Sequence, residues 1–132
     1  VGMVYGRGIL MVDAARWFSR YALLGVWQKP TWIHLISTED FLEATRAACM
    51  KEGIEGIYHI GDDGVQTLQE FLDEAAKHWH TVKPCLFGVR SPLTVDFIRI
   101  GQVSYYGDTS RMKEELLPRL KYRDFREGIG TL

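Results

Sequence analysis

Short apolar runs alternate with longer stretches of helical periodicity along this chain. The first run, Val1–Tyr5, is followed by a Gly-Arg-Gly turn at residues 6–8, a pattern typical of a buried strand that leads into a turn. From residue 9 to residue 24 apolar side chains recur at helical spacing, and Gly25 follows where a glycine often ends a helix. Residues 32–36, Trp-Ile-His-Leu-Ile, come after a proline and predict a short strand.

The middle of the chain carries two helix start signals, separated by one short apolar run. Ser37 can accept hydrogen bonds from the free amides of a helix start, and the acidic residues at 39 and 40 favour its positive end. Residues 57–60, Ile-Tyr-His-Ile, predict a further buried strand. Residues 67–70, Thr-Leu-Gln-Glu, form a capping box. We expect the first helix to bury Phe41, Leu42, Thr45, Ala48 and Cys49, and the second to bury a stripe of Leu68, Phe71, Leu72, Ala75, Ala76 and Trp79.

The rest of the chain predicts three short helices. A Ser-Pro pair opens a helix over residues 91–100, an Asp-Thr pair precedes a helix over residues 112–117, and residues 124–127 begin a last helical turn. Strands and helices therefore alternate, which predicts an α/β protein with few short, partly parallel strands and several packed helices. No repeat or linker divides residues 1–132, so we treat them as one unit. Three short strands make a thin sheet for so many apolar helices, as expected if the rest of the sheet lies outside this segment.

Composition excludes several classes of partner. Sixteen Lys and Arg residues against seventeen Asp and Glu give a net charge of -1, whereas binding to nucleic acid or to an anionic membrane needs an excess of positive charge. No apolar run is long enough to span a membrane. Cys49 and Cys85 do not make a disulfide framework, so we expect a reducing, cytoplasmic setting, with Cys49 as a small buried apolar residue.

The sequence shows no complete active site. The turn at residues 6–8 lacks the further glycine of a dinucleotide fingerprint, because Met11 stands at that place. A tight strand-to-helix turn is the first interpretation of these residues, and a ligand-lining loop is the second. No serine elbow and no phosphate-binding Walker loop is present.

The positions of the histidines favour structural roles over catalytic ones. His78 and His80 lie two residues apart near a helix end, where their side chains diverge and make a poor metal pair. His34 and His59 each lie inside an apolar run, where a packed, hydrogen-bonded ring is the more frequent role. We therefore predict no metal site.

Four segments carry a resemblance to a known family. They are Gly2–Gly8, Trp32–Ala44, Gly56–Gly61 with the helix after Thr67, and Tyr106–Arg111 with Glu127–Ile129. In this order they resemble the strand and Tyr-Gly-Pro-Gly type turn, the Ile-His…Asp…Ala block, the Gly-x-x-Tyr-Asn-Ile-Gly block and the Asp-x-Ser-Lys…Glu-Gly block of the extended short-chain dehydrogenase/reductases. This is the NAD(P)-dependent epimerase/dehydratase family, and the resemblance covers its C-terminal half.

The resemblance implies a division between cofactor and substrate. The family holds NAD or NADP on an N-terminal Rossmann sheet, and its C-terminal part closes over a small-molecule substrate. On this basis Met3 and Val4 lie near the nicotinamide end of the cofactor, Tyr5 and Arg7 face the substrate cleft, and His34 is structural. We expect the Rossmann half to lie outside this chain and to be its partner, and a homodimer is compatible with the family.

Two departures bear on the substrate. The sugar-nucleotide epimerases of the family carry an Arg where this chain has Pro30, and Arg99 is a stand-in for a second phosphate-binding Arg. The Gly-x-x-Gly-x-x-Gly loop and the catalytic Tyr-x-x-x-Lys pair do not occur in residues 1–132. The sequence thus predicts the substrate-binding portion of an epimerase, dehydratase or reductase that acts on a sugar nucleotide or a related hydroxyl or carbonyl compound and is inactive by itself. The alternative is a stand-alone, non-catalytic α/β binding or interaction module.

Overall fold

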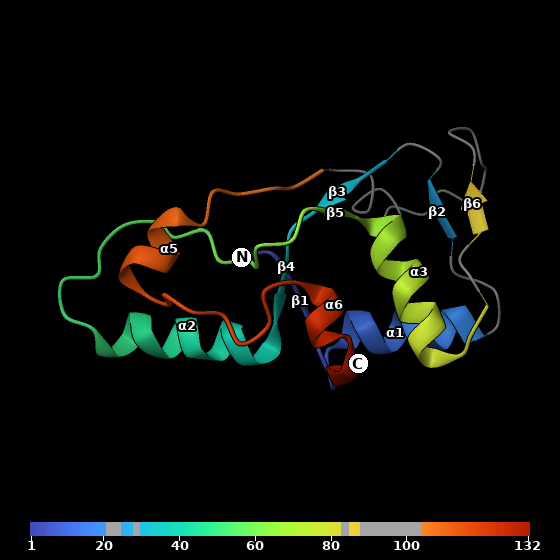
Figure 1. The fold of residues 1–132 in the computed structure, drawn as a ribbon, viewed down its shortest axis with the longest axis horizontal. Coiled ribbons are helices and arrows are strands. Elements are labelled where there is room, and N and C mark those ends of the chain that lie inside the picture. Colours follow the sequence, from blue (N-terminus) through green and yellow to red (C-terminus); the bar gives the residue numbers. More distant parts are fainter. Residues whose placement is uncertain (21–24, 28–29, 83–84, 88–103) are drawn as a thin grey trace.

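The computed structural model describes residues 1–20, 25–27, 30–82, 85–87 and 104–132 (Figure 1). The elements follow one another in the order β1 (Met3–Tyr5), α1 (Leu10–Arg20), β2 (Gly25–Trp27), β3 (Trp32–Ile33), β4 (Leu35–Ser37), α2 (Thr38–Met50), β5 (Gln66–Thr67), α3 (Leu68–Trp79), β6 (Cys85–Phe87), α5 (Ser110–Glu115), α6 (Phe125–Gly128) and a 3-10 turn at Ile129–Thr131. The helix predicted over residues 91–100 and the candidate residue Arg99 lie outside the described ranges.

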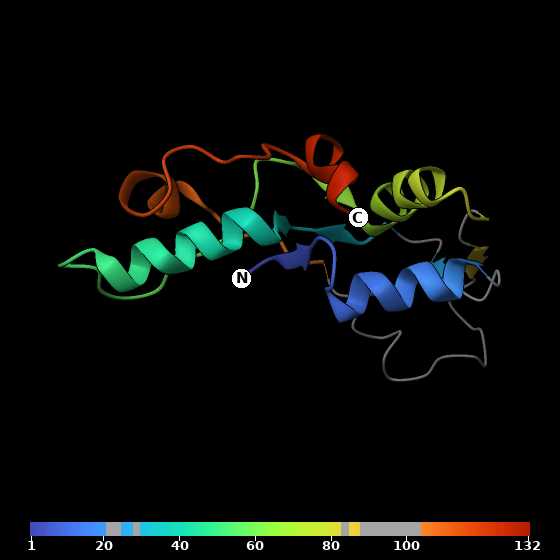
Figure 2. The same cartoon turned by 90° about the horizontal axis from the view of Figure 1, so that it is seen from below.

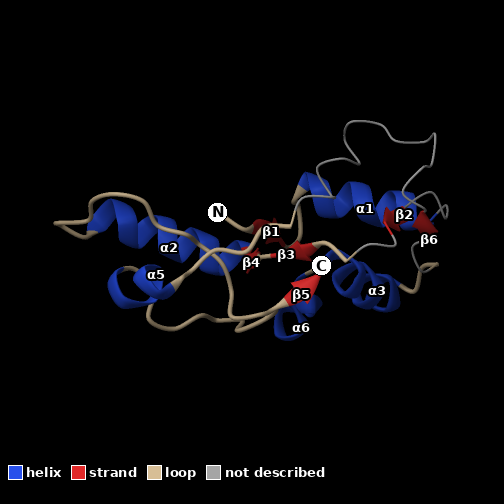
Figure 3. Cartoon of the chain, turned by 90° about the horizontal axis from the view of Figure 1, so that it is seen from above, coloured by secondary structure: helices blue, strands red, loops and turns tan. Residues whose placement is uncertain are grey.

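The strands form three pairs, two of them parallel. β1 pairs with β4 in parallel, with Met3 opposite Leu35 and Tyr5 opposite Ser37. β2 and β6 are also parallel, whereas β3 and β5 are antiparallel. Helices make up most of the regular structure (Figure 3). The predicted α/β class with few short, partly parallel strands is confirmed.

The molecule is elongated, with the β1–β4 pair near its middle (Figures 1 and 2). α2 and α5 lie toward one end, and α1 and α3 lie toward the other. No helix in the described ranges is long and apolar enough to cross a membrane.

The core is built around α3. Thr67 caps this helix in a reciprocal box with Glu70, as predicted, and the apolar stripe that follows faces the interior. The Phe71 ring lies between Tyr5 and Phe125, with ring centroids 6.4 Å and 5.5 Å apart. The core cluster therefore joins β1, α3 and α6, and its other buried members are Val12, Ile33, Leu35, Leu72, Ala75, Trp79 and Leu132.

Two predicted strands differ in the structure. Residues 32–36 do not form one strand, because the chain changes partner at His34 and places β3 and β4 in different sheets. Residues 57–60 form no strand; the Ile60 carbonyl accepts a hydrogen bond from Gly2 N (2.7 Å), and the Ile57 side chain is 80% exposed. Gly25 begins β2, so it is not the predicted helix cap.

The predicted buried face of α2 is also wrong. Leu42 is 58% exposed and Cys49 is exposed, whereas Asp40 and Ala44 are buried. The face toward the interior is set by a polar residue, since the Asp40 carboxylate bonds to a segment near the C-terminus. An apolar pattern cannot reveal this arrangement.

Candidate functional site

The candidate site is the edge where the parallel strands β1 and β4 end. Tyr5 closes β1 and leads into the turn at residues 6–8, and Ser37 closes β4 and caps α2. Open α/β sheets bind ligands at the carboxyl ends of their strands. The two strand ends, the turn and the first turn of α2 therefore meet at the position where such a fold places a ligand.

Close packing against Thr38 explains why residue 6, the first residue of the turn, is a glycine. Gly6 has a φ of 141°, and a Cβ at this position would overlap the Thr38 hydroxyl. That hydroxyl donates to the Tyr5 carbonyl (2.9 Å), which joins α2 to the end of β1. Gly8 also has a positive φ, 82°, but no atom lies within 4 Å of a Cβ built there.

The sequence-predicted site residues on β1 and its turn have different environments. Met3 and Val4 are half-buried, and Arg7 is exposed in the turn. Tyr5 is fully buried in the core, and its hydroxyl lies 3.5 Å from the Asp124 carbonyl, to which it donates. Burial raises the pKa of the Tyr5 phenol, and acidic groups nearby raise it further, so the phenol keeps its proton.

His34 has the structural role expected of it. The buried ring bonds through Nε2 to the Asp62 carbonyl (2.8 Å), and Nδ1 accepts from Gly107 N (3.2 Å). Since Nδ1 is an acceptor and Nε2 a donor, the ring is neutral and both nitrogens are occupied. It also stacks on Tyr106 at 4.5 Å. By contrast, His59 is exposed beside the Tyr105 hydroxyl, so its prediction as a packed strand residue is wrong.

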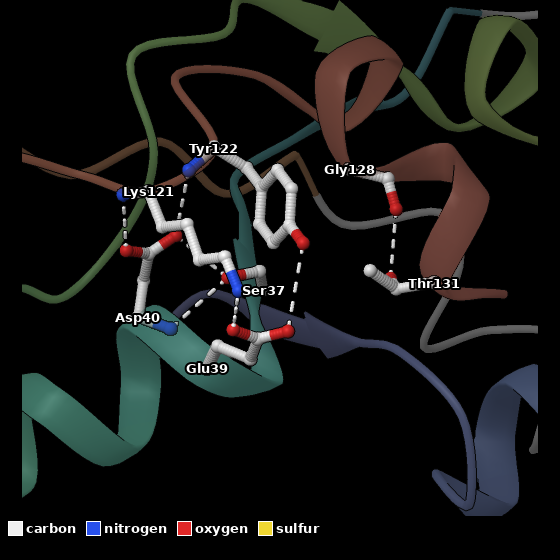
Figure 4. Close-up of polar contacts among 7 residues, drawn as sticks. All are labelled: Ser37, Glu39, Asp40, Lys121, Tyr122, Gly128 and Thr131. Atoms are coloured by element: carbon white, nitrogen blue, oxygen red, sulfur yellow. Dashed lines mark hydrogen bonds and ion pairs between the residues drawn. The ribbon is translucent and has the colours of Figure 1, made fainter.

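A polar network holds the C-terminal segment against the start of α2 (Figure 4). Asp40 is 2% exposed, and its carboxylate accepts from Lys121 N (2.6 Å), Tyr122 N (3.1 Å) and the Ser37 hydroxyl (2.6 Å). Glu39 contacts the Lys121 ammonium and the Tyr122 hydroxyl on the exposed side. Sequence reasoning gave Asp40 only a helix-end role, because its partners are backbone amides about eighty residues away.

The Arg111 side chain joins α5 to the segment before β5. Its Nη2 donates to the Glu55 carbonyl (2.7 Å), its Nε bonds to Glu115 (3.0 Å), and its guanidinium lies 4.3 Å from the centre of the Tyr58 ring. Asp108 accepts from the Ser110 hydroxyl (2.5 Å) and from Ser110 N (2.9 Å), and these local hydrogen bonds lower the pKa of its carboxyl group. The Asp-x-Ser-Arg segment therefore has a structural role in the described part of the chain.

Three residues of β1 and its turn can bind a ligand. Arg7 can bind an anion or a hydroxyl, and Met3 and Val4 can offer apolar contact. No group of three or more His, Cys, Asp or Glu in the described ranges could hold a metal ion. The turn at residues 6–8 offers one cation beside a two-stranded sheet, which does not fit the phosphates of a dinucleotide without further elements.

Comparisons with known proteins identify solved structures with a similar fold. No protein-family model and no curated protein matches the chain. A functionally unknown conserved protein from Silicibacter pomeroyi is similar, with a TM-score of 0.79 and 22% identity over 98% of this chain and 45% of that one. The UDP-glucose 4-epimerase of Thermus thermophilus, solved with NAD, has a TM-score of 0.66 and 23% identity over 98% and 42%. MoeE5, solved with UDP-glucuronic acid and NAD, has a TM-score of 0.70 and 18% identity over 98% and 43%. The chain thus shares their fold and spans less than half of their length.

Proposed function

We propose that this chain, whose fold is that of the C-terminal part of the extended short-chain dehydrogenase/reductases, is the substrate-binding portion of an NAD(P)-dependent epimerase, dehydratase or reductase. The observation that carries the proposal is the structural match along 98% of the chain to sugar-nucleotide enzymes solved with NAD. The four sequence segments with the same resemblance support it independently, because they follow the family's order.

In this proposal, one part of the enzyme holds the cofactor and this chain binds the substrate. NAD or NADP would accept or donate the hydride, and a Rossmann half with the Tyr-x-x-x-Lys pair would hold it outside these 132 residues. The residues of this chain bind and orient. Met3 and Val4 would contact the nicotinamide end, and Arg7 would contact the substrate. Because Tyr5 is buried against Phe71, we propose that it fixes the strand end before Arg7 and does not contact the substrate itself.

The proposed substrate is a sugar nucleotide or a related hydroxyl or carbonyl compound. Arg7 is exposed at the strand edge and can pair with a phosphate or a hydroxyl group. Arg99 would supply a second cation, in the role that the resemblance gives it. Pro30 replaces an expected phosphate-binding Arg, which favours a substrate with fewer phosphate contacts than a UDP-sugar. We also propose a cytoplasmic enzyme with no nucleic-acid partner, able to form a homodimer.

The test uses the intact enzyme encoded by the reading frame that contains this chain. We expect Arg7→Ala to raise the KM for the substrate about 10- to 100-fold with little change in kcat, because a charge-assisted hydrogen bond contributes about 1.5–3 kcal/mol. The matched control is Arg46→Ala, an exposed arginine on α2 that pairs with Glu43 at 3.7 Å. Chromatographic separation of substrate and product provides the assay, with a panel of UDP-sugars and simpler hydroxyl and carbonyl compounds, because an epimerase or dehydratase restores its NAD(P) in each turnover and gives no net absorbance change. Equal KM values for the two variants would contradict the role of Arg7.

The second candidate is a stand-alone, non-catalytic α/β binding or interaction module. Its support is that the described residues hold no complete catalytic set and that the chain is nearly neutral. The coding sequence upstream of the Val1 codon separates the two proposals. An in-frame glycine-rich fingerprint followed by Tyr-x-x-x-Lys supports the enzyme, and a start codon directly before Val1 supports the binding module.

A further inference from the structure

Two buried polar side chains lie in the segment between Gly61 and β5. Asp62 is 1% exposed and Gln66 is 0% exposed. Asp62 Oδ1 accepts a hydrogen bond from Gly64 N (3.1 Å), but Asp62 Oδ2 and both polar atoms of the Gln66 side chain have no partner among the described residues. Buried polar groups in proteins are almost always hydrogen-bonded. Three unpaired atoms on two neighbouring side chains therefore require a physical explanation.

The backbone fixes Asp62 firmly at this place. Its amide donates to the Leu35 carbonyl (2.6 Å) on β4, and its carbonyl bonds to Nε2 of His34 (2.8 Å). The next residue, Asp63, donates through its amide to the Arg123 carbonyl (2.8 Å) near α6. The segment thus joins β4 to the C-terminal part of the chain, and the Asp62 side chain cannot leave the interior without breaking these contacts.

The charged neighbours of Asp62 disfavour a second negative charge. Asp124, at the start of α6, and Asp63 are both acidic, and Lys113 of α5 is already paired with Asp63. The His34 ring is neutral, with both nitrogens occupied. The titratable groups that face Asp62 are therefore Tyr5 from β1, His34 beside β4, Asp63 and its partner Lys113, and Asp124 from α6.

We infer that Asp62 is held as a neutral carboxylic acid in the folded protein, and that losing this proton to solvent loosens the segment over residues 61–66. Protonation removes the negative charge from a carboxyl group that is only 1% exposed. A charged Asp62 would instead leave Oδ2 as an unpaired anionic oxygen in the interior, next to Asp124. The inference does not depend on the reaction proposed above.

The pH range over which Asp62 affects stability follows from the direction in which its pKa is shifted. Burial raises the pKa of Asp62 from 3.8 to about 7, and the charges of Asp124 and Asp63 act in the same direction, while the Gly64 amide and the Gln66 side chain act against it. Between these two values the folded state binds a proton that the unfolded state has lost. The ratio of folded to unfolded protein should therefore fall by up to about tenfold per pH unit from about pH 4 to about pH 7, and this contribution should be constant above that range.

The decisive measurement follows the Asp62 carboxyl carbon by NMR in the folded, aspartate-labelled chain. We expect its chemical shift to titrate near neutral pH. A midpoint below pH 5 would overturn the inference, and this readout needs no variant to fold. Assignment uses Asp62→Asn, which removes the carboxyl group and keeps a side chain of similar size without a charge.

Urea denaturation from pH 4 to pH 8 gives the second readout. The wild-type stability, relative to that of Asp62→Asn, should fall as the pH rises to 7. The matched control is Glu43→Gln, which neutralises an exposed carboxylate on α2 that pairs with Arg46 and should keep the wild-type dependence on pH. Parallel pH profiles for the wild type and Asp62→Asn would also overturn the inference.

Discussion

The carboxylate of Asp40 should contribute more to stability than any exposed ion pair around it. Asp40→Ala removes the acceptor of two part-buried backbone amides, Lys121 N and Tyr122 N, and of the Ser37 hydroxyl. Each buried donor left without a partner costs about 1–3 kcal/mol. Since water can reach part of this site after truncation, we expect a total loss of about 2–4 kcal/mol in the free energy of unfolding.

The matched control for this prediction is Glu39→Ala. Glu39 is the neighbouring acidic residue and contacts the same two partners through the Lys121 ammonium and the Tyr122 hydroxyl, but on the exposed side (Figure 4). Exposed ion pairs contribute about 0–1 kcal/mol.

Urea denaturation followed by circular dichroism gives both values. With an m-value of about 1–3 kcal/mol/M, Asp40→Ala should lower the midpoint by about 1–2 M and Glu39→Ala by much less. Equal losses for the two variants, or a change in m for the first, would refute the role assigned to the buried carboxylate.

Four further substitutions test other parts of the structure by the same denaturation assay. Gly6→Ala should cost about 2–4 kcal/mol and Gly8→Ala about 1 kcal/mol, because both have a positive φ but only the first would overlap Thr38; equal costs would argue against the close packing. His34→Ala should cost about 2–4 kcal/mol, since it removes two hydrogen bonds and a stacked, buried ring; a neutral result would contradict its structural role. Thr67→Ala should cost about 0.5–2 kcal/mol through the lost cap of α3, with a matching loss of helical signal on heating.

Local signals in the sequence were sufficient for the starts of α2, α3 and α6, whereas α5 begins at Ser110 without a side-chain cap, two residues before the predicted start. Ser37, Thr67 and Asp124 each cap a helix, as their positions predict, because each accepts hydrogen bonds from amides two or three residues further along the chain. The apolar stripe on α3 was equally predictable, since its burial follows from a single amphipathic periodicity. The α/β class followed from the alternation of these elements.

Features that depend on distant residues were not predictable in this way. The break between β3 and β4 arises because the two halves of one apolar run pair with different strands, β5 after the run and β1 before it. The buried face of α2 is set by Asp40 and backbone amides near the C-terminus, so its apolar pattern was misleading. The unpaired atoms of Asp62 and Gln66 likewise result from tertiary burial and leave no pattern in the sequence.

The candidate site remains a prediction that came from the resemblance, and the structure adds the environment of its residues. The resemblance directed attention to residues 3–7; in the structure Met3 begins β1, and Tyr5 and the turn after it lie at the carboxyl end of the parallel pair. The structure also shows that the Tyr5 side chain faces the core, which alternation along so short a strand could not establish.

Calorimetric titration with NADH tests the central proposal most directly, which is that this chain supplies the substrate side of an enzyme whose cofactor is held elsewhere. Two polypeptides are compared, the 132-residue chain and the same chain extended upstream in its reading frame. We predict no measurable binding by the 132-residue chain and one bound NADH per molecule of the extended polypeptide. Tight one-to-one binding of NADH by the 132-residue chain would contradict the proposal.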